Sequence, residues 1–321
     1  MNKSYLILLL LLISTSCSKQ ENPTNPVIQT RYDLIPENAV KMNPQNDTFP
    51  PVIHSSQWNQ PEPLDSPVNS AGIEDSPFIT PQGDWFFFFF TPDASQPAQN
   101  QIVDGFSGIW WSMRSGNNWT EPVRVKLSSD LALDGAEFIA NDTLWFGSVR
   151  TGNYGEIDIY FALYNENNWT GWTNAGETLN SIYDIGEFHI TSDGDTLYFG
   201  SNTLSGYGQT DLWLTERSTG SWSSPVNLGG IINSTNNENQ PFVTEDKTEL
   251  WFTSESRLGY PGPAVFRSVK TDSGWSQPQE IISNFSGEPC LDNQGNIYFT
   301  HHYCDSTSRI IESDIYIAIK R

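Results

Sequence analysis

Acidic residues recur just before five short apolar segments, and they are the side chains best suited to chemistry in this chain. They are Glu74 and Asp75, Asp134 and Glu137, Asp184 and Glu187, Glu238, and Glu288. Carboxylates gathered in one place raise one another's pKa or bind a cation. They therefore predict a ligand site for which Ca²⁺, a cation that prefers oxygen ligands, is the candidate cofactor. The alternative is that each acid caps its own turn in bulk water.

A repeat must position these acids. It consists of a short apolar strand, a tight polar turn and a second, aromatic strand, and it spans residues 76–88, 136–147, 186–200, 240–253 and 288–300. The turns contain the Gly, Asn and Asp residues that hairpins require. The run Trp85–Phe90 fits a strand covered on both faces, so we expect it in the core. A third strand follows each hairpin, at residues 108–113, 158–163, 211–216, 264–269 and 314–319.

A fourth strand begins near Trp119, Trp169, Trp222 and Trp275, but the fifth unit has none. A spare Trp-x-x-Pro segment lies near the N-terminus, at Trp58–Pro61. Pairing of that segment with the last unit would remove the open edge. The sequence therefore predicts an all-β, five-bladed β-propeller in which the N-terminal strand (residues 57–65) completes the last blade.

The loops between second and third strands are the long ones, and long loops on a rigid scaffold tend to carry function. By topology they share a face with the recurring acids. Three of them carry a tyrosine beside glycine, namely Tyr154, Tyr207 and Tyr260. An exposed tyrosine can stack on a sugar or on a partner side chain. The alternative is a tyrosine folded over its own loop.

The N-terminus indicates export. Lys3 precedes nine mostly apolar residues (5–13), which are too few to span a bilayer, and small residues and Cys17 follow. The segment before Cys17 resembles the lipobox of bacterial lipoproteins, and this resemblance implies cleavage before Cys17 and its lipidation. We expect a signal peptide at residues 1–16, a flexible linker at 17–50 and a single domain at 51–321. The formal net charge of −22 argues against nucleic acid and anionic lipid surfaces as partners.

The stretch 188–228 resembles the TolB-type, WD-like propeller repeat of bacterial envelope proteins. It matches that repeat in its Asp-Gly-x-x-Leu-Tyr-Phe-x-Ser run, its glycine-rich loop, its Asp-Leu-Trp segment and its Trp-x-x-Pro-x-x-Leu ending. This family is mostly non-catalytic. The resemblance therefore implies a scaffold or binding role in the bacterial envelope, and it implies the fold more firmly than the function.

Two functions remain open. The first is a monomeric lipoprotein of the outer membrane whose propeller binds a glycan or an envelope protein without catalysis. The second is a glycoside hydrolase, because Asp75 and Glu288 lie in stretches similar to the acid motifs of five-bladed glycosidases. Asp75, Glu288 and Glu137 would then be the catalytic carboxylates. Their separation would distinguish the cases, since retaining enzymes need about 5–5.5 Å between two carboxyl groups and inverting enzymes about 6.5–9.5 Å.

Overall fold

The computed structural model of the protein describes residues 30–93, 95–127, 132–165, 168–180, 185 and 187–321. The predicted signal peptide, the lipidation site Cys17 and the acid Asp184 lie outside these residues. No helix in the described ranges is long and apolar enough to cross a membrane. The helices are η1 (Arg31–Leu34), α1 (Ala98–Asp104) and α2 (Glu177–Asn180).

Strands make up most of the remaining ordered structure, and they alternate along the chain as successive hairpins. The N-terminal segment contributes β1 (Val52–Ile53) and β2 (Glu62–Pro63). The first repeat unit forms β3 (Ile73–Ile79), β4 (Trp85–Thr91), β5 (Gly108–Ser115), β6 (Asn118–Trp119) and β7 (Val123–Arg124). The second forms β8 (Ala132–Ala140), β9 (Thr143–Arg150), β10 (Asp158–Asn165) and β11 (Asn168–Asn174).

The remaining three units follow the same plan. The third forms β12 (Phe188–Ile190), β13 (Thr196–Ser201), β14 (Asp211–Ser218), β15 (Ser221–Trp222) and β16 (Val226–Asn227). The fourth forms β17 (Glu238–Val243), β18 (Glu249–Glu255), β19 (Pro263–Thr271), β20 (Gly274–Trp275) and β21 (Gln279–Ser283). The fifth forms β22 (Ser286–Leu291), β23 (Ile297–Cys304) and β24 (Ile310–Ala318).

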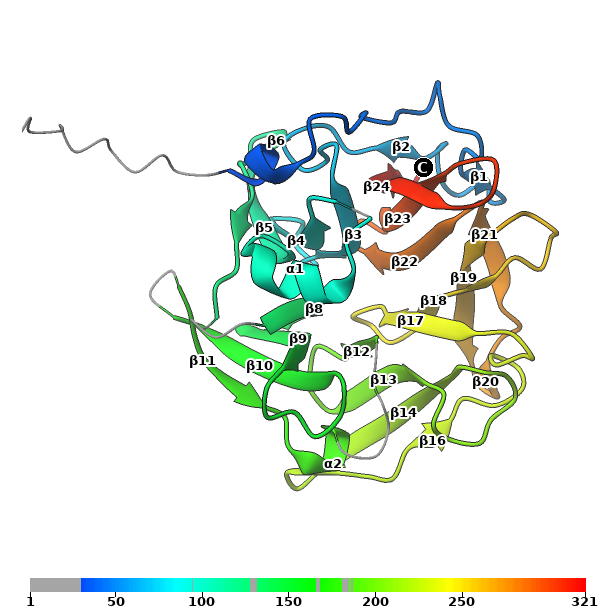
Figure 1. Ribbon diagram of the computed structural model, residues 1–321. Coiled ribbons are helices and arrows are strands. Elements are labelled where there is room, and N and C mark those ends of the chain that lie inside the picture. The colour runs from blue at the N-terminus through cyan, green and yellow to red at the C-terminus, as the bar shows by residue number, and fades with distance from the viewer. Residues whose placement is uncertain (1–29, 94, 128–131, 166–167, 181–184, 186) are drawn as a thin grey trace, which may run out of the picture.

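Hydrogen bonds gather these strands into four sheets. Within each unit the first, second and third strands pair antiparallel, which confirms the predicted hairpins. The largest sheet combines the fifth and first units through a parallel contact between Ser313 and Ile73. Figure 1 shows the units arranged around a common centre, with the first strand of each unit nearest to it.

The N-terminal segment pairs with the last strand, as predicted. Glu62 and Pro63 pair antiparallel with Ile317 and Tyr316, and Trp58 forms a bridge with Lys320. Trp58 is buried, its Nε1 donates to the Gly295 carbonyl at 2.8 Å, and its ring lies edge-on to Trp251. The edge of β24 is therefore covered by the segment that the repeat pattern left over.

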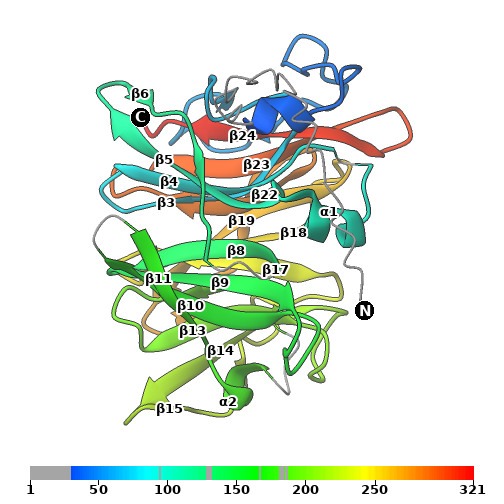
Figure 2. The ribbon, with the colours of Figure 1, turned by 60° about the vertical axis from the view of Figure 1, so that its left-hand side comes forward.

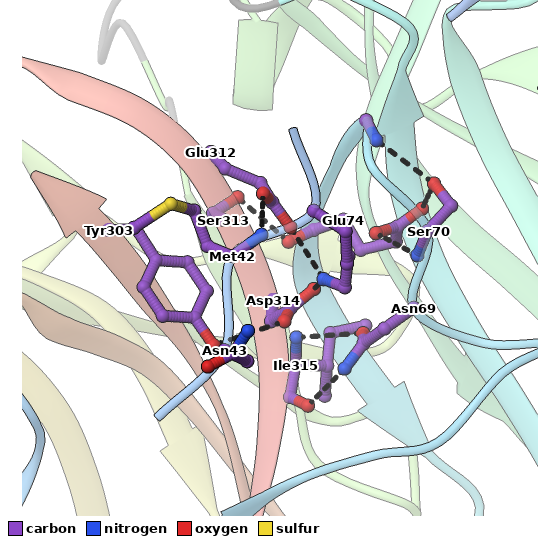
Figure 3. A network of polar contacts seen from close by, with 12 residues as sticks. Met42, Asn43, Asn69, Ser70, Glu74, Tyr303, Glu312, Ser313, Asp314 and Ile315 are labelled. Carbon is purple, nitrogen blue, oxygen red and sulfur yellow. Dashed lines mark hydrogen bonds and ion pairs between the residues drawn. The ribbon is translucent and has the colours of Figure 1, made fainter. Parts of the chain in front are cut away.

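Residues 30–50 are packed against the domain, which corrects the predicted boundary at residue 51. Arg31 is buried and forms an ion pair with Glu74, which is buried as well, at 3.1 Å. Lys41 pairs with Glu312 and Asp314, and the Met42 amide donates to Glu312 at 2.6 Å. Figure 3 shows Met42 beside Glu312, with Asp314 and Glu74 nearby, and Figure 2 shows the N-terminal segment running along β24. Of the acids that anchor this segment, Glu74 was predicted as part of a ligand site, and Glu312 carries no signal in the repeat.

The core lies between neighbouring units and is strongly aromatic. Phe86, Phe87, Phe88 and Phe90 of β4 are all fully buried, which confirms the prediction for the run Trp85–Phe90. Burial of each such ring contributes roughly 2–3 kcal/mol. A scaffold of this kind holds the strand ends, and hence the acids, in fixed positions.

Candidate functional site

Four of the innermost strands contain a β-bulge one or two residues before the anchor position of the repeat. The pairing register shifts between Asp75 and Phe78, between Gly135 and Phe138, between Asn239 and Phe242, and between Gly287 and Cys290. At each shift one residue other than glycine has a positive φ: Ser76 (47°), Ala136 (51°), Gln240 (54°) and Glu288 (56°). Such bulges bend the strand and re-aim its side chains.

The sequence contains a signal for these bulges in addition to the repeat. Pro77, Pro241 and Pro289 each lie directly before the anchor position. Proline has no amide hydrogen, so inside a sheet it is confined to edges, strand starts and bulges. A proline directly before the anchor position of an innermost strand therefore predicts a bulge in that strand.

The predicted acids separate into two groups, and the first group is structural. Glu74 accepts hydrogen bonds from the Ser70 amide at 2.9 Å and its hydroxyl at 2.5 Å, and it pairs with Arg31. Glu238 repeats this pattern with Ser234 at 2.9 and 2.5 Å.

Cationic partners complete this structural group. Arg257 lies 3.3 Å from Glu238, and Arg150 lies 2.6 Å from Asp134. Three of the predicted ligand-binding residues, Glu74, Asp134 and Glu238, thus each have an arginine partner, and none of them lines the small cavity that holds the second group.

The second group of acids meets at the centre. Glu137, Glu187 and Glu288 line one small cavity of about 50 Å³ together with Gln240, and Asp75 lies beside it in hydrogen-bond contact with Glu288. We call this cavity the channel mouth. The predicted residues Asp75, Glu137, Glu187 and Glu288 are therefore brought together, and Gln240 is a member that sequence reasoning missed because it is not acidic.

Glu288 holds the channel mouth together. Its Oε1 accepts from Gln240 Nε2 at 2.6 Å, and its Oε2 accepts from the Ser76 amide and the Thr300 hydroxyl, both at 2.7 Å. Burial, followed by the charge of Asp75, raises the pKa of Glu288 well above its usual value.

Asp75 has the opposite shift. Burial alone would raise the pKa of Asp75, but the hydrogen bond with Glu288, the nearby His302 and the bond from Thr300 outweigh it, so the pKa lies below its usual value. Glu288 therefore keeps the proton of the pair, while Asp75 is ionised.

Glu137 differs from every other acid of the site. Glu137 is 4% exposed, and no other described residue donates a hydrogen bond to either carboxylate oxygen. Burial raises the pKa of Glu137 well above its usual value, and the charges of Glu187 and Asp75 raise it further. Glu187 behaves similarly, since burial and the charge of Asp75 raise its pKa to about 7.

Aromatic side chains form the floor of the channel mouth. The rings of Phe138 and Phe78 lie 6.3 Å apart, and those of Phe138 and Phe188 lie 5.4 Å apart. His189 packs against Phe242 at 4.8 Å, and burial lowers its pKa to about 3, so it is neutral at physiological pH. A second cavity of about 60 Å³ lies beyond these rings. The anchor residues of the repeat thus separate the two cavities.

Metal ligation is not prearranged here. Across the described stretches of the chain, no three His, Cys, Asp or Glu side chains are gathered closely enough to hold a metal ion. The oxygen atoms of the channel mouth would suit a hard cation such as Ca²⁺ by type, but not by their present grouping.

The predicted tyrosines lie in exposed, well-braced loops. Tyr154, Tyr207 and Tyr260 are 55%, 56% and 37% exposed. The buried carboxylate of Asp211 accepts from the amides of Tyr207 and Gly208 at 2.7 and 2.9 Å. Asp158 does the same for the amides of Tyr154 and Gly155, both at 3.0 Å. These two aspartates open the third strands β14 and β10, so each loop is fixed by the strand that follows it.

A groove of about 450 Å³ lies beside Tyr260. Asn237, Asn239, Thr253 and Glu255 contribute to its wall. The groove lies next to the channel mouth, because the hydroxyl of Thr253 accepts a hydrogen bond from the Glu288 amide at 2.8 Å. The Tyr260 ring is supported by His54 of the N-terminal segment, with 5.2 Å between the ring centroids. An aromatic side chain next to amide and hydroxyl groups suits a polar ligand with apolar faces.

Comparison with known proteins identifies the fold. The protein matches no family model and no curated protein. The solved structure of a complex between BT0996 and RGII is 9% identical, with a TM-score of 0.52, and the match covers 86% of this protein and 92% of that one. The α-L-arabinofuranosidase of Podospora anserina in complex with cellotriose is 13% identical, with a TM-score of 0.51 and coverage of 83% and 97%. The fold is a β-propeller.

A third similar structure is the putative TolB of Agrobacterium tumefaciens. It is 11% identical, with a TM-score of 0.45, and the match covers 78% of this protein and 92% of that one. At such low identities the first two structures show the fold alone, and the site residues of this protein have to be interpreted from their own geometry.

Proposed function

We propose that this protein is a five-bladed, lipid-anchored propeller of the bacterial outer membrane that binds a glycan without cleaving it. The last blade is completed by residues 57–65, and Cys17 carries the lipid. The ligand lies on the long-loop face, across the tyrosines and the groove beside Tyr260. We expect the protein to act as a monomer that meets the membrane only through its anchor.

The observation that carries this proposal is the set of exposed tyrosines on braced loops. Tyr154 and Tyr207 are more than half exposed, although buried aspartates hold their backbone amides in place. A rigid aromatic platform loses little conformational entropy on binding, which favours weak polar ligands such as sugars. The groove beside Tyr260 has the volume of a small-molecule site.

The arrangement of the carboxyl groups supports binding without cleavage. Asp75 and Glu288 are in direct hydrogen-bond contact. That contact is closer than the separations of about 5–5.5 Å or 6.5–9.5 Å that the two glycosidase mechanisms require. The channel mouth, at about 50 Å³, is also too small for a sugar ring.

A glycoside hydrolase is the second candidate, and the split protonation of the Asp75–Glu288 pair favours it. A proton held by Glu288 beside an ionised Asp75 has the character of an acid–base pair. Hydrolysis of arabinan, xylan and pectic oligosaccharides by the wild type and by Glu288→Gln would test it. Cleavage that is lost in the variant would establish the enzyme, and absence of cleavage would dismiss it.

A screen of the purified full-length protein on a glycan array tests the main proposal. We expect retention of one class of glycan, and loss of that binding in a Tyr207→Ala, Tyr154→Ala double variant. Failure to bind any glycan, together with capture of an envelope protein on the same face, would replace the glycan with a protein partner. Calorimetric titration with Ca²⁺ tests the proposed cofactor, and the absence of heat would remove it.

A further inference from the structure

The acidic side chains of the channel mouth have no cationic partner among the described residues of its wall. Glu137, Glu187 and Glu288 line it, and none of the described residues that form its wall is a lysine or an arginine. The histidine in the wall, His189, has its pKa lowered to about 3 and contributes no positive charge. Elsewhere in the described chain, the buried acids Glu74 and Glu238 each have an arginine.

Glu137 points to a missing partner. Its two carboxylate oxygens are buried, they belong to the wall of the cavity, and no other described residue donates to either of them. Buried polar atoms are almost always hydrogen-bonded, so an orphaned carboxylate requires an explanation. Gln240, the amide donor in the wall, is engaged by Glu288 at 2.6 Å and by Glu187. No described residue therefore supplies the donor that Glu137 lacks, and a ligand that enters the cavity can supply it.

The shape of the cavity limits what that donor can be. Its volume of about 50 Å³ exceeds the roughly 10–15 Å³ that one water needs, so it can hold a small head group but no ring. Its floor consists of phenylalanine rings, including Phe78 and Phe138, whose faces attract cations. Carboxylates at the wall and aromatic rings at the floor together select a small organic cation.

We infer that the channel mouth binds the primary ammonium group of a ligand, with Glu137 and Glu187 as its hydrogen-bond acceptors. A primary ammonium supplies three N–H donors, which the orphaned oxygens of Glu137 require. A quaternary ammonium would satisfy the rings but offers no donor. A bare metal ion fits less well, because the described acids are not gathered as ligands.

This inference rests on the proposed function for the identity of the ligand. If a glycan lies across the long-loop face, then the ammonium belongs to an amino sugar whose amine is free. The groove beside Tyr260 adjoins the channel mouth through Thr253, so one sugar unit can occupy the groove while the amine reaches the cavity. An N-acetylated sugar has no such charge and would bind without using Glu137.

Calorimetric and NMR titrations of the full-length protein test the inference, with methylammonium as the first probe. We expect saturable binding that weakens at least about tenfold in Glu137→Gln, since one charge-assisted hydrogen bond is worth about that factor. Glu156→Gln is the matched control, because Glu156 is an exposed acid on the same face, outside the cavity. The Glu156→Gln variant should bind methylammonium as tightly as the wild type does. Glu187→Gln, at the same cavity, serves as a second variant should Glu137→Gln fail to fold.

The other probes distinguish the remaining outcomes. Equal binding of tetramethylammonium, displacement of methylammonium by Ca²⁺, or no saturable binding would each overturn the inference. Oligosaccharides of glucosamine should bind more tightly than those of N-acetylglucosamine, and this preference should vanish in Glu137→Gln. Methylammonium binding without any glycan binding would refute the proposed function and leave the inference standing. Glycan binding that does not depend on a free amine would support the proposed function and refute the inference.

Discussion

Gln240 donates a hydrogen bond from Nε2 to Glu288 Oε1 at 2.6 Å, and this bond joins the innermost strands of the fourth and fifth units. The second oxygen of Glu288 accepts from the Ser76 amide of the first unit at 2.7 Å. One carboxyl group therefore connects three units across the place where the first and last units meet. The acids of the channel mouth thus have a structural role in addition to any ligand.

Replacement of Trp58 by alanine tests closure of the last blade by the N-terminal strand. Trp58 is buried, donates to the Gly295 carbonyl and packs on Trp251. We expect the free energy of unfolding to fall by about 3–5 kcal/mol, as for other buried tryptophans. Trp222→Ala, at the corresponding but more exposed position of the third unit, should cost less. Equal losses in urea unfolding would show that the N-terminal strand is not essential to closure.

The ion pair of Arg31 with Glu74 tests whether residues 30–50 belong to the folded domain. Arg31→Ala leaves the buried Glu74 without its counter-charge, and we expect a loss of about 3–5 kcal/mol in the free energy of unfolding. Arg309→Ala removes the exposed pair with Asp305 and should change stability by less than about 1 kcal/mol. Chemical unfolding of both variants gives the comparison. If the Arg31→Ala variant is as stable as the wild type, residues 30–50 are a linker and do not contribute to the folded domain.

The raised pKa of Glu187 predicts how stability depends on pH. Its pKa of about 7 in the folded protein lies above the ordinary value of 4.5, so the folded state binds the extra proton. That contribution is complete below about pH 4.5 and is lost as the pH rises through 7. In Glu187→Gln the fall in unfolding free energy between pH 5 and pH 7 should shrink by about 1–3 kcal/mol. If the unfolding free energies of the wild type and of Glu187→Gln depend on pH in the same way, the pKa of Glu187 is not raised in the folded protein.

Asp211→Asn tests the bracing of the tyrosine loops. Asparagine keeps one carbonyl acceptor but places its amide NH2 group against the backbone amide of either Tyr207 or Gly208, so one of these two bonds is lost. We expect amide hydrogen exchange in residues 202–210 to accelerate by about tenfold, and ligand affinity to fall with it. Asp246→Asn, which alters an exposed turn outside this loop, is the control. Unchanged exchange in the loop would mean that the aspartate does not hold it.

The sequence was most informative where structure is local and repeated. The hairpins, the buried run Trp85–Phe90 and the pairing of the segment at Trp58 with the end of the last unit were all predicted, because turn residues and aromatic strands recur at regular offsets. The sequence shows a spare strand near the N-terminus and a missing fourth strand in the last unit, and neither observation requires knowledge of a long-range contact. The number of blades stays a prediction of the same pattern.

The site was predicted less well, for physical reasons. Glu74 and Glu137 look equivalent in the sequence, yet one has Arg31 and two bonds from Ser70 while the other accepts no hydrogen bond from any other described residue. The difference depends on a residue far away in the chain and on a bulge that rotates the strand, and neither follows from spacing. Gln240 escaped notice because the pattern at the innermost strands was one of acidic residues, and glutamine is not acidic.

A glycan array measures directly whether the long-loop face binds a glycan. The full-length wild type should retain one class of glycan, with a preference for members that carry a free amine. The Tyr154→Ala, Tyr207→Ala double variant should lose that binding while it melts at the same temperature as the wild type. Binding that survives intact in the double variant, or a wild type that binds no glycan at all, would contradict the account.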